Sequence, residues 1–148
     1  MSRRGAHWRK NQGKDRYFQQ AQAEGYRARS VYKLEGIQRK FRLLRRGDRV
    51  LDIGAAPGSW SQYAREQVGD DGLVVAVDLT AIEPLEGVAT VQGDIREPAV
   101  RARVDELAGG QPFDVVISDI APNTTGIQVT DHARSIELSL FALSIALE

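Results

Sequence analysis

Apolar residues change their spacing several times along the chain, which predicts alternating helices and strands. Val31, Leu34, Ile37 and Phe41 recur at helical spacing, so we predict a helix over residues 30–41 with Ser30 as its N-cap. After it, short runs rich in Val, Ile and Leu alternate with turns and helical segments. The predicted strands are 49–53, 73–79, 88–95 and 113–122, and the further predicted helices are 60–68, 98–110 and 131–148.

Strands of this kind, separated by helices, are typical of an α/β fold whose mostly parallel sheet has helices on both faces. Right-handed crossovers then bring the carboxyl ends of the strands to one edge, where a doubly wound, Rossmann-like fold binds its ligand. The length of 148 residues suits one such domain. We predict a flexible basic arm over residues 1–16 and one domain over 17–148, in which a basic helical region (17–46) precedes the βαβ part (47–148).

Composition excludes several classes of protein. No apolar run approaches the roughly 18 residues of a membrane-spanning helix, and no apolar segment follows the basic N-terminus as in a secretory signal. The chain has no cysteine, and its two histidines, His7 and His132, lie far apart. We therefore expect a cytoplasmic protein with no membrane partner and no metal site.

The neutral total charge conceals a strong asymmetry. Residues 1–49 hold fifteen Lys and Arg against four acids, and the remainder holds five against sixteen. Aromatic residues are interleaved with the basic ones, which favours a polyanion such as nucleic acid as the partner. A disordered solubilising arm, or a tail that folds onto the acidic half, is the alternative.

The segment VLDIGAAPGSW (50–60) places a glycine turn directly after the first strand. Neither GxGxxG nor GxxxxGK[ST] is present, which weighs against dinucleotides and nucleoside triphosphates. Asp52 would repel a pyrophosphate but suits an ammonium or sulfonium group, and S-adenosylmethionine carries both. An ordinary strand-to-helix turn explains the glycines alone equally well.

Acids also end the later strands. Asp78 is placed to accept from a ribose diol, Asp94 to accept from an adenine amino group, and Asp119 stands at the mouth of the site. Each alone is more often a structural cap. Together with Asp52 they predict a nucleoside-type ligand.

Five segments resemble one family: YRARSVYKL (26–34), LDIGAAPGSWSQ (51–62), VVAVDL (74–79), GDI (93–95) and SDIAPNTTG (118–126). The chain is similar, from about residue 15 onward, to the FtsJ-type ribosomal RNA ribose 2′-O-methyltransferases. The resemblance implies a Rossmann-like, S-adenosylmethionine-dependent methyltransferase fold. It also implies methylation of a uridine ribose 2′-hydroxyl in the large-subunit (23S) rRNA, free or in the 50S particle, by a protein that is a monomer when complete.

The resemblance also implies roles for individual residues. Gly58 and Trp60 would hold the methionine part of the cofactor, Asp78 its ribose and Asp94 its adenine, with Asp119 next to the sulfonium. Lys33 and Asp119 match the first two members of the family's Lys–Asp–Lys–Glu catalytic group. We expect RNA-binding residues in the basic half, namely Arg27, Arg29 and Lys33.

The sequence also departs from the family. Lys40 is the last lysine, so the second lysine and the glutamate of the catalytic group are absent, and the chain ends inside a predicted apolar helix. The implied domain therefore lacks its C-terminal strands, and we expect this chain to be inactive alone. The alternative is a catalytically inactive RNA- or cofactor-binding fragment of such an enzyme. A nicotinamide dehydrogenase, which Asp78 would suit, is disfavoured because GxGxxG is absent.

Overall fold

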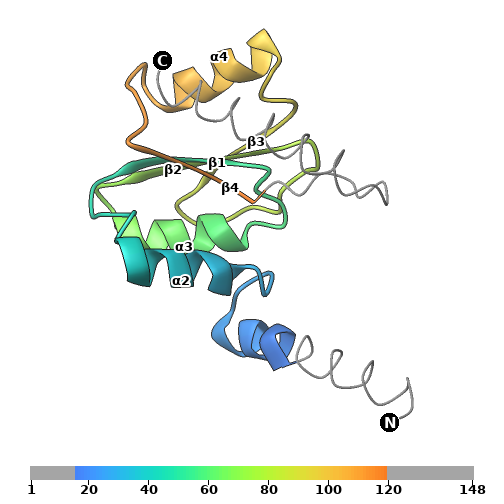
Figure 1. The fold of residues 1–148 in the computed structure, drawn as a ribbon. Helices are drawn as coiled ribbons and strands as arrows, with labels where there is room; N and C mark the ends of the chain where they lie inside the picture. Colours follow the sequence, from blue (N-terminus) through green and yellow to red (C-terminus); the bar gives the residue numbers. More distant parts are fainter. Residues whose placement is uncertain (1–15, 120–148) are drawn as a thin grey trace, which may run out of the picture.

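A computed structural model describes residues 16–119 and shows a parallel sheet with helices on both faces (Figure 1). Residues 16–24 are helical. The elements that follow are α2 (Val31–Phe41), β1 (Arg49–Ile53), α3 (Ser59–Val68), β2 (Leu73–Asp78), β3 (Ala89–Gln92), α4 (Pro98–Leu107) and β4 (Val115–Ser118). The predicted α/β fold is confirmed, and each observed element overlaps its predicted range. The predicted arm up to residue 15, the predicted helix 131–148 and the expected lack of later strands lie outside the described residues.

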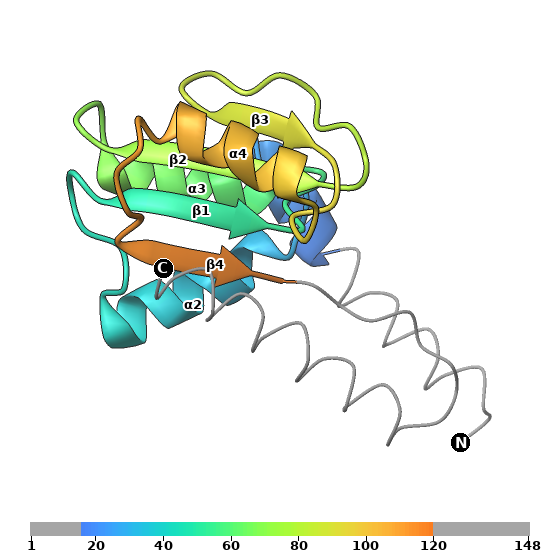
Figure 2. The same cartoon turned by 90° about the horizontal axis from the view of Figure 1, so that it is seen from above.

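The strand order is β3-β2-β1-β4, and every pair is parallel. Figure 2 shows the strands in this order with their carboxyl ends at one edge. The chain moves outward from β1 to β3 and then returns to the other side of β1 with β4. The gap between the ends of β1 and β4 is therefore the topological switch point, where open α/β sheets bind ligands.

Two apolar layers cover the sheet. Helices α2 and α3 lie on one face and α4 on the other (Figure 1). Side chains alternate along β1: Val50 packs with the α2 and α3 layer, whereas Leu51 and Ile53 pack with the α4 layer. By the same alternation, Asp52 faces α3, where its carboxylate meets Ser61.

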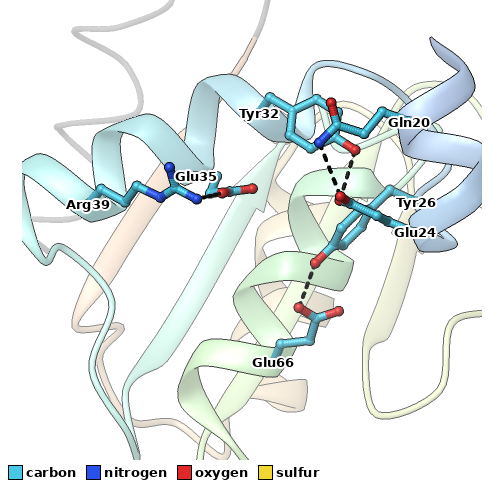
Figure 3. Close-up of polar contacts among 7 residues, drawn as sticks. All are labelled: Gln20, Glu24, Tyr26, Tyr32, Glu35, Arg39 and Glu66. Carbon is cyan, nitrogen blue, oxygen red and sulfur yellow. Dashed lines mark hydrogen bonds and ion pairs between the residues drawn. The ribbon is translucent and has the colours of Figure 1, made fainter. Parts of the chain in front are cut away.

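The basic helical region is docked on this framework through tyrosines (Figure 3). The Tyr32 hydroxyl donates to Glu24 at 2.9 Å, and the Tyr26 hydroxyl donates to Glu66 of α3 at 2.7 Å. Burial, aided by these carboxylates, raises the pKa of Tyr26 well above its usual value and the pKa of Tyr32 to about 12. Both hydroxyls therefore stay protonated donors, and this part of the basic block is folded onto α3.

Ser30 is the N-cap residue of α2, as predicted, but its side chain does not cap the helix. Its side chain makes no capping hydrogen bond, and its backbone is already helical, with φ −57° and ψ −18°. The hydroxyl instead shares a 3.2 Å hydrogen bond with Ser59 at the start of α3. A capping hydroxyl points back at the helix amides, whereas this one is used between two helices.

Candidate active site

The glycine turn after β1 is fastened to the neighbouring strand β2. The amides of Gly54 and Ala55 donate to the Val77 carbonyl at 2.8 and 3.1 Å, and the Ala56 amide donates to Asp78 Oδ2 at 2.9 Å. The peptide bond between Ala56 and Pro57 is cis. These bonds hold the turn at the carboxyl edge of the sheet.

Gly58 ends the turn in a conformation that requires glycine. Its φ is +119°, and a Cβ there would lie 2.8 Å from Leu85 Cδ1 and 3.3 Å from Arg27 Nη1. The positive φ strains any residue other than glycine, and a Cβ would in addition require the Leu85 side chain to move. Helix α3 starts at the next residue, Ser59.

Trp60 lies in the first turn of α3 and is 6% exposed. Its indole Nε1 donates to the Ser30 carbonyl at 2.8 Å, so its polar edge is satisfied within the protein. The indole N–H of Trp60 is therefore not free to donate to a ligand. The role in holding the methionine part stays a prediction.

Asp52 is a buried acid at the same place, 1% exposed on β1. Burial raises the pKa of its carboxyl group to about 7; the charges of Asp119 and Asp78 act in the same direction, and the hydrogen bond from Ser61 opposes them. The Ser61 hydroxyl donates to it at 2.7 Å. This site therefore contains a carboxyl group that changes charge near neutral pH.

Asp78 ends β2 as predicted, and its carboxylate accepts two backbone amides, from Ala56 at 2.9 Å and Thr80 at 2.8 Å. Two amides leave a carboxylate with acceptor capacity for a further donor. Asp78 thus holds the glycine turn in place, and its role toward a ribose stays a prediction.

Asp94 follows β3 and is already paired. Both of its oxygens accept from the Arg96 guanidinium, at distances between 2.7 and 3.2 Å, and Oδ1 also accepts the Arg96 amide at 2.9 Å. These bonds hold the pKa of Asp94 below its usual value. An adenine amino group would share this carboxylate with Arg96, and that contact also stays a prediction.

Lys33 and Asp119, the two predicted catalytic residues, lie together. Lys33 Nζ donates to Asp119 Oδ1 at 3.1 Å, although the two residues are 86 positions apart. The lysine side chain is 67% exposed and the aspartate 34%. An exposed pair of this kind adds little stability, so its position at the strand edge is the more informative feature.

A recess lies beside this pair, at the switch point between β1 and β4. It is lined by the turn after β1, the first residues of α3, the residue before α2 and two acids: Ser30, Asp52, Gly54, Ala55, Ala56, Pro57, Ser59, Trp60 and Asp119. Three of the predicted site residues, Asp52, Trp60 and Asp119, are thus brought to one place, whereas Gly58 is not among the residues that line the recess. Asp78 and Asp94 follow the two neighbouring strands along the same edge.

The three predicted RNA-binding residues have different surroundings. Lys33 and Arg29 are exposed, and the Arg29 guanidinium makes no hydrogen bond or ion pair with any described residue. Arg27 is half-buried, and its guanidinium donates to the carbonyls of Pro57, Glu83 and Pro84. RNA binding by these residues stays a prediction, but the donors of Arg27 are already directed at the protein.

Sequence reasoning missed the residues that join the basic region to the site. Gln62 accepts the Arg27 amide at 2.9 Å and donates to the Gly25 carbonyl at 3.0 Å. Ser61 supplies the hydrogen bond that buried Asp52 needs. A signal for Ser61 existed, because an acid inside an apolar strand requires a buried donor on the element packed against it.

Within residues 16–119, no group of three or more acidic or histidine side chains is placed to hold a metal ion. No helix in that same range is long and apolar enough to cross a membrane.

Residues 26–148 match the family model described as FtsJ-like methyltransferase. The chain is 58% identical over 133 residues to the ribosomal RNA large subunit methyltransferase E of Methanothrix thermoacetophila, with 90% of this chain and 51% of that protein covered. It is 52% identical over 135 residues to the protein of the same name from Syntrophobacter fumaroxidans, with 90% and 68% covered. The chain thus spans about half to two thirds of the length of these curated relatives.

A solved structure supports the fold independently. A ribosomal RNA methyltransferase from Plasmodium falciparum superposes with a TM-score of 0.73 at 29% sequence identity. The match covers 80% of this chain and 69% of that structure. The match to a methyltransferase structure agrees with the predicted Rossmann-like methyltransferase fold.

Proposed function

The chain belongs to the FtsJ-like methyltransferase family, and from this premise we propose that its protein transfers a methyl group from S-adenosylmethionine to a uridine ribose 2′-hydroxyl of large-subunit rRNA. The curated relatives carry the name of an rRNA large subunit methyltransferase, which supports rRNA as the methylated molecule. Family membership makes the nicotinamide dehydrogenase interpretation wrong. A role on ribosomal RNA also favours a cytoplasmic protein whose substrate is the rRNA or the 50S particle.

The observation that carries the ribose assignment is the Lys33–Asp119 pair beside the recess. It brings a cation from the basic helical region within 3.1 Å of the acid that ends β4. A lysine there has ammonium hydrogens that can be donated to a ribose hydroxyl, and the carboxylate fixes their direction. The pair can thus orient a hydroxyl at the edge of the recess.

The recess fits S-adenosylmethionine by the chemistry of its lining. Asp52 presents a buried carboxyl group, and its charged form is stabilised by an ammonium group or a sulfonium. We assign the turn from Gly54 to Gly58 and Trp60 to the methionine part, Asp78 to the ribose and Asp94 to the adenine. When bound, this cofactor supplies the activated methyl group.

We propose that the residues of the chain act mainly by orienting the ribose hydroxyl and the cofactor for methyl transfer. Methyl transfer is an in-line displacement, and holding two reactants in line can lower a barrier by about 7–11 kcal/mol. Asp119 reaches both the recess and Lys33, so it connects the cofactor side to the RNA side. We assign contacts with the phosphates of the substrate to Arg29 and Lys33, and their exposure supports this.

The test is transfer of a labelled methyl group to large-subunit rRNA that lacks the modification, by the full-length protein to which this chain belongs. Lys33→Ala should lower single-turnover transfer about 100-fold or more, because the oriented cation is lost, while changing S-adenosylhomocysteine affinity less than about twofold. Lys40→Ala, on the same helix, is the matched control and should keep both properties. Equal transfer by the Lys33 and Lys40 variants would overturn the assignment.

A further inference from the structure

Arg27 joins two loops that are distant in sequence. Its Nη1 donates to the Pro57 carbonyl at 3.0 Å and to the Glu83 carbonyl at 2.7 Å, and its Nη2 donates to the Pro84 carbonyl at 2.8 Å. Pro57 belongs to the glycine turn after β1, and Glu83 and Pro84 belong to the loop after β2. One guanidinium therefore connects two loops of the ligand-binding edge.

The Arg27 side chain also lies close to Gly58, in the glycine turn to which it donates. Arg27 Nη1 and Cδ lie 3.3 and 3.6 Å from the position that a Cβ of Gly58 would take. Gln62 of α3 holds the backbone of Arg27 at 2.9 Å and thus aims the side chain. Arg27 is consequently anchored from its amide to its guanidinium.

We propose that Arg27 is a positioning residue that sets the spacing of the two loops around the cofactor, and that it does not contact RNA phosphates. The inference rests on the proposed function, since it takes the cofactor site to lie between these loops. A planar guanidinium can donate to three carbonyls of two loops at fixed angles, whereas an ammonium is a point charge with no fork. Arg27→Lys removes the forked guanidinium but keeps the positive charge, so both loops should lose their connection.

Arg29 provides a matched control. It lies two residues away, carries the same side chain and is exposed, and its guanidinium contacts no described residue through a hydrogen bond or ion pair. A phosphate-binding role is therefore expected for Arg29 and a loop-holding role for Arg27. Substitution of Arg27 should therefore change cofactor affinity, and substitution of Arg29 should change the salt dependence of RNA binding.

The experiment compares Arg27→Lys, Arg27→Ala, Arg29→Lys and Arg29→Ala in the folded protein. S-adenosylhomocysteine affinity is measured by calorimetry, and the slope of log K against log salt is measured with an rRNA fragment. Both Arg27 variants should weaken S-adenosylhomocysteine about tenfold or more and leave the slope unchanged. Arg29→Ala should flatten the slope by about 0.7–0.9 and leave the cofactor affinity within about twofold.

A second experiment uses proteolysis to measure how accessible the loop after β2 is when no ligand is bound. A Glu-specific protease should cleave after Glu86, in the loop after β2, faster in Arg27→Lys than in wild type, with Arg29→Lys unchanged. Wild-type S-adenosylhomocysteine affinity in Arg27→Lys, or a slope in Arg27→Ala as flat as in Arg29→Ala, would overturn the inference. If the wild-type protein bound no S-adenosylhomocysteine at all, the proposed function itself would fail.

Discussion

Replacement of Asp52 by asparagine should make the protein less sensitive to pH. Asp52 is 1% exposed, and burial raises the pKa of its carboxyl group to about 7. In an unfolded chain the same group has a pKa of about 3.9. The folded protein therefore keeps the proton that the unfolded chain has lost, so wild-type stability falls as pH rises from about 4 to about 7 and is constant above that range.

The size of the effect follows from the shift. A difference of about 3 pH units, at about 1.4 kcal/mol each, gives an upper value of about 4 kcal/mol for the complete loss. Between pH 5 and pH 8 the wild type should lose about 2–3 kcal/mol through this group. The asparagine side chain of the variant carries no charge at any pH and can still accept the Ser61 hydroxyl, so Asp52→Asn should not show this loss.

The assay is urea unfolding at pH 5 and pH 8. At each pH, the free energy of unfolding of the wild type is subtracted from that of Asp52→Asn. That difference should change by about 2–3 kcal/mol in favour of the variant at pH 8. Asp71→Asn, which removes an exposed acid, is the control and should show no such change. A difference between Asp52→Asn and wild type that is the same at both pH values would refute the reasoning about Asp52.

Three further predictions concern single residues. Asp78→Ala should weaken S-adenosylhomocysteine by about 1–3 kcal/mol in calorimetry, because it removes both the acceptor for the ribose and the acceptor for the Ala56 amide; an unchanged affinity would make Asp78 a strand cap only. Asp119→Asn should lower methyl transfer more than it lowers cofactor affinity, since it weakens the contact to Lys33, and equal losses in both assays would count against this. Arg42→Gly should stabilise the protein by about 0.5–1 kcal/mol in urea unfolding, because Arg42 has a left-handed φ of 48° after α2, whereas Lys40→Gly within α2 should destabilise it.

The sequence predicted the fold well because the fold depends on local patterns. Runs such as LVVAVD in β2 are buried on both faces of a parallel sheet, so their composition alone identifies them. The predicted helix 98–110 is observed as α4, which ends before Gly109 and Gly110; their φ values of 66° and 73° are left-handed, as is common for glycines that end a helix. Because the strands are parallel, the acids at their carboxyl ends could be predicted to lie along one edge of the sheet.

The contacts that build the site were less predictable because they join distant segments. Arg27 reaches Glu83 across 56 positions, and nothing in the local pattern distinguishes it from Arg29. The same holds for Ser30, which has the position of an N-cap but bonds to Ser59. Charge density along the sequence locates the basic region, but only the contacts in the structure show which of its cations bond to other parts of the protein.

Methyl transfer to a ribose hydroxyl can be distinguished from transfer to a base by identifying the methylated nucleoside. Large-subunit rRNA lacking the modification is incubated with S-adenosylmethionine and the full-length protein to which this chain belongs, then digested to nucleosides and analysed by mass spectrometry. We expect 2′-O-methyluridine from the wild type and from Lys40→Ala but not from Lys33→Ala. A uridine methylated on its base, or the same yield of 2′-O-methyluridine from Lys33→Ala, would contradict it.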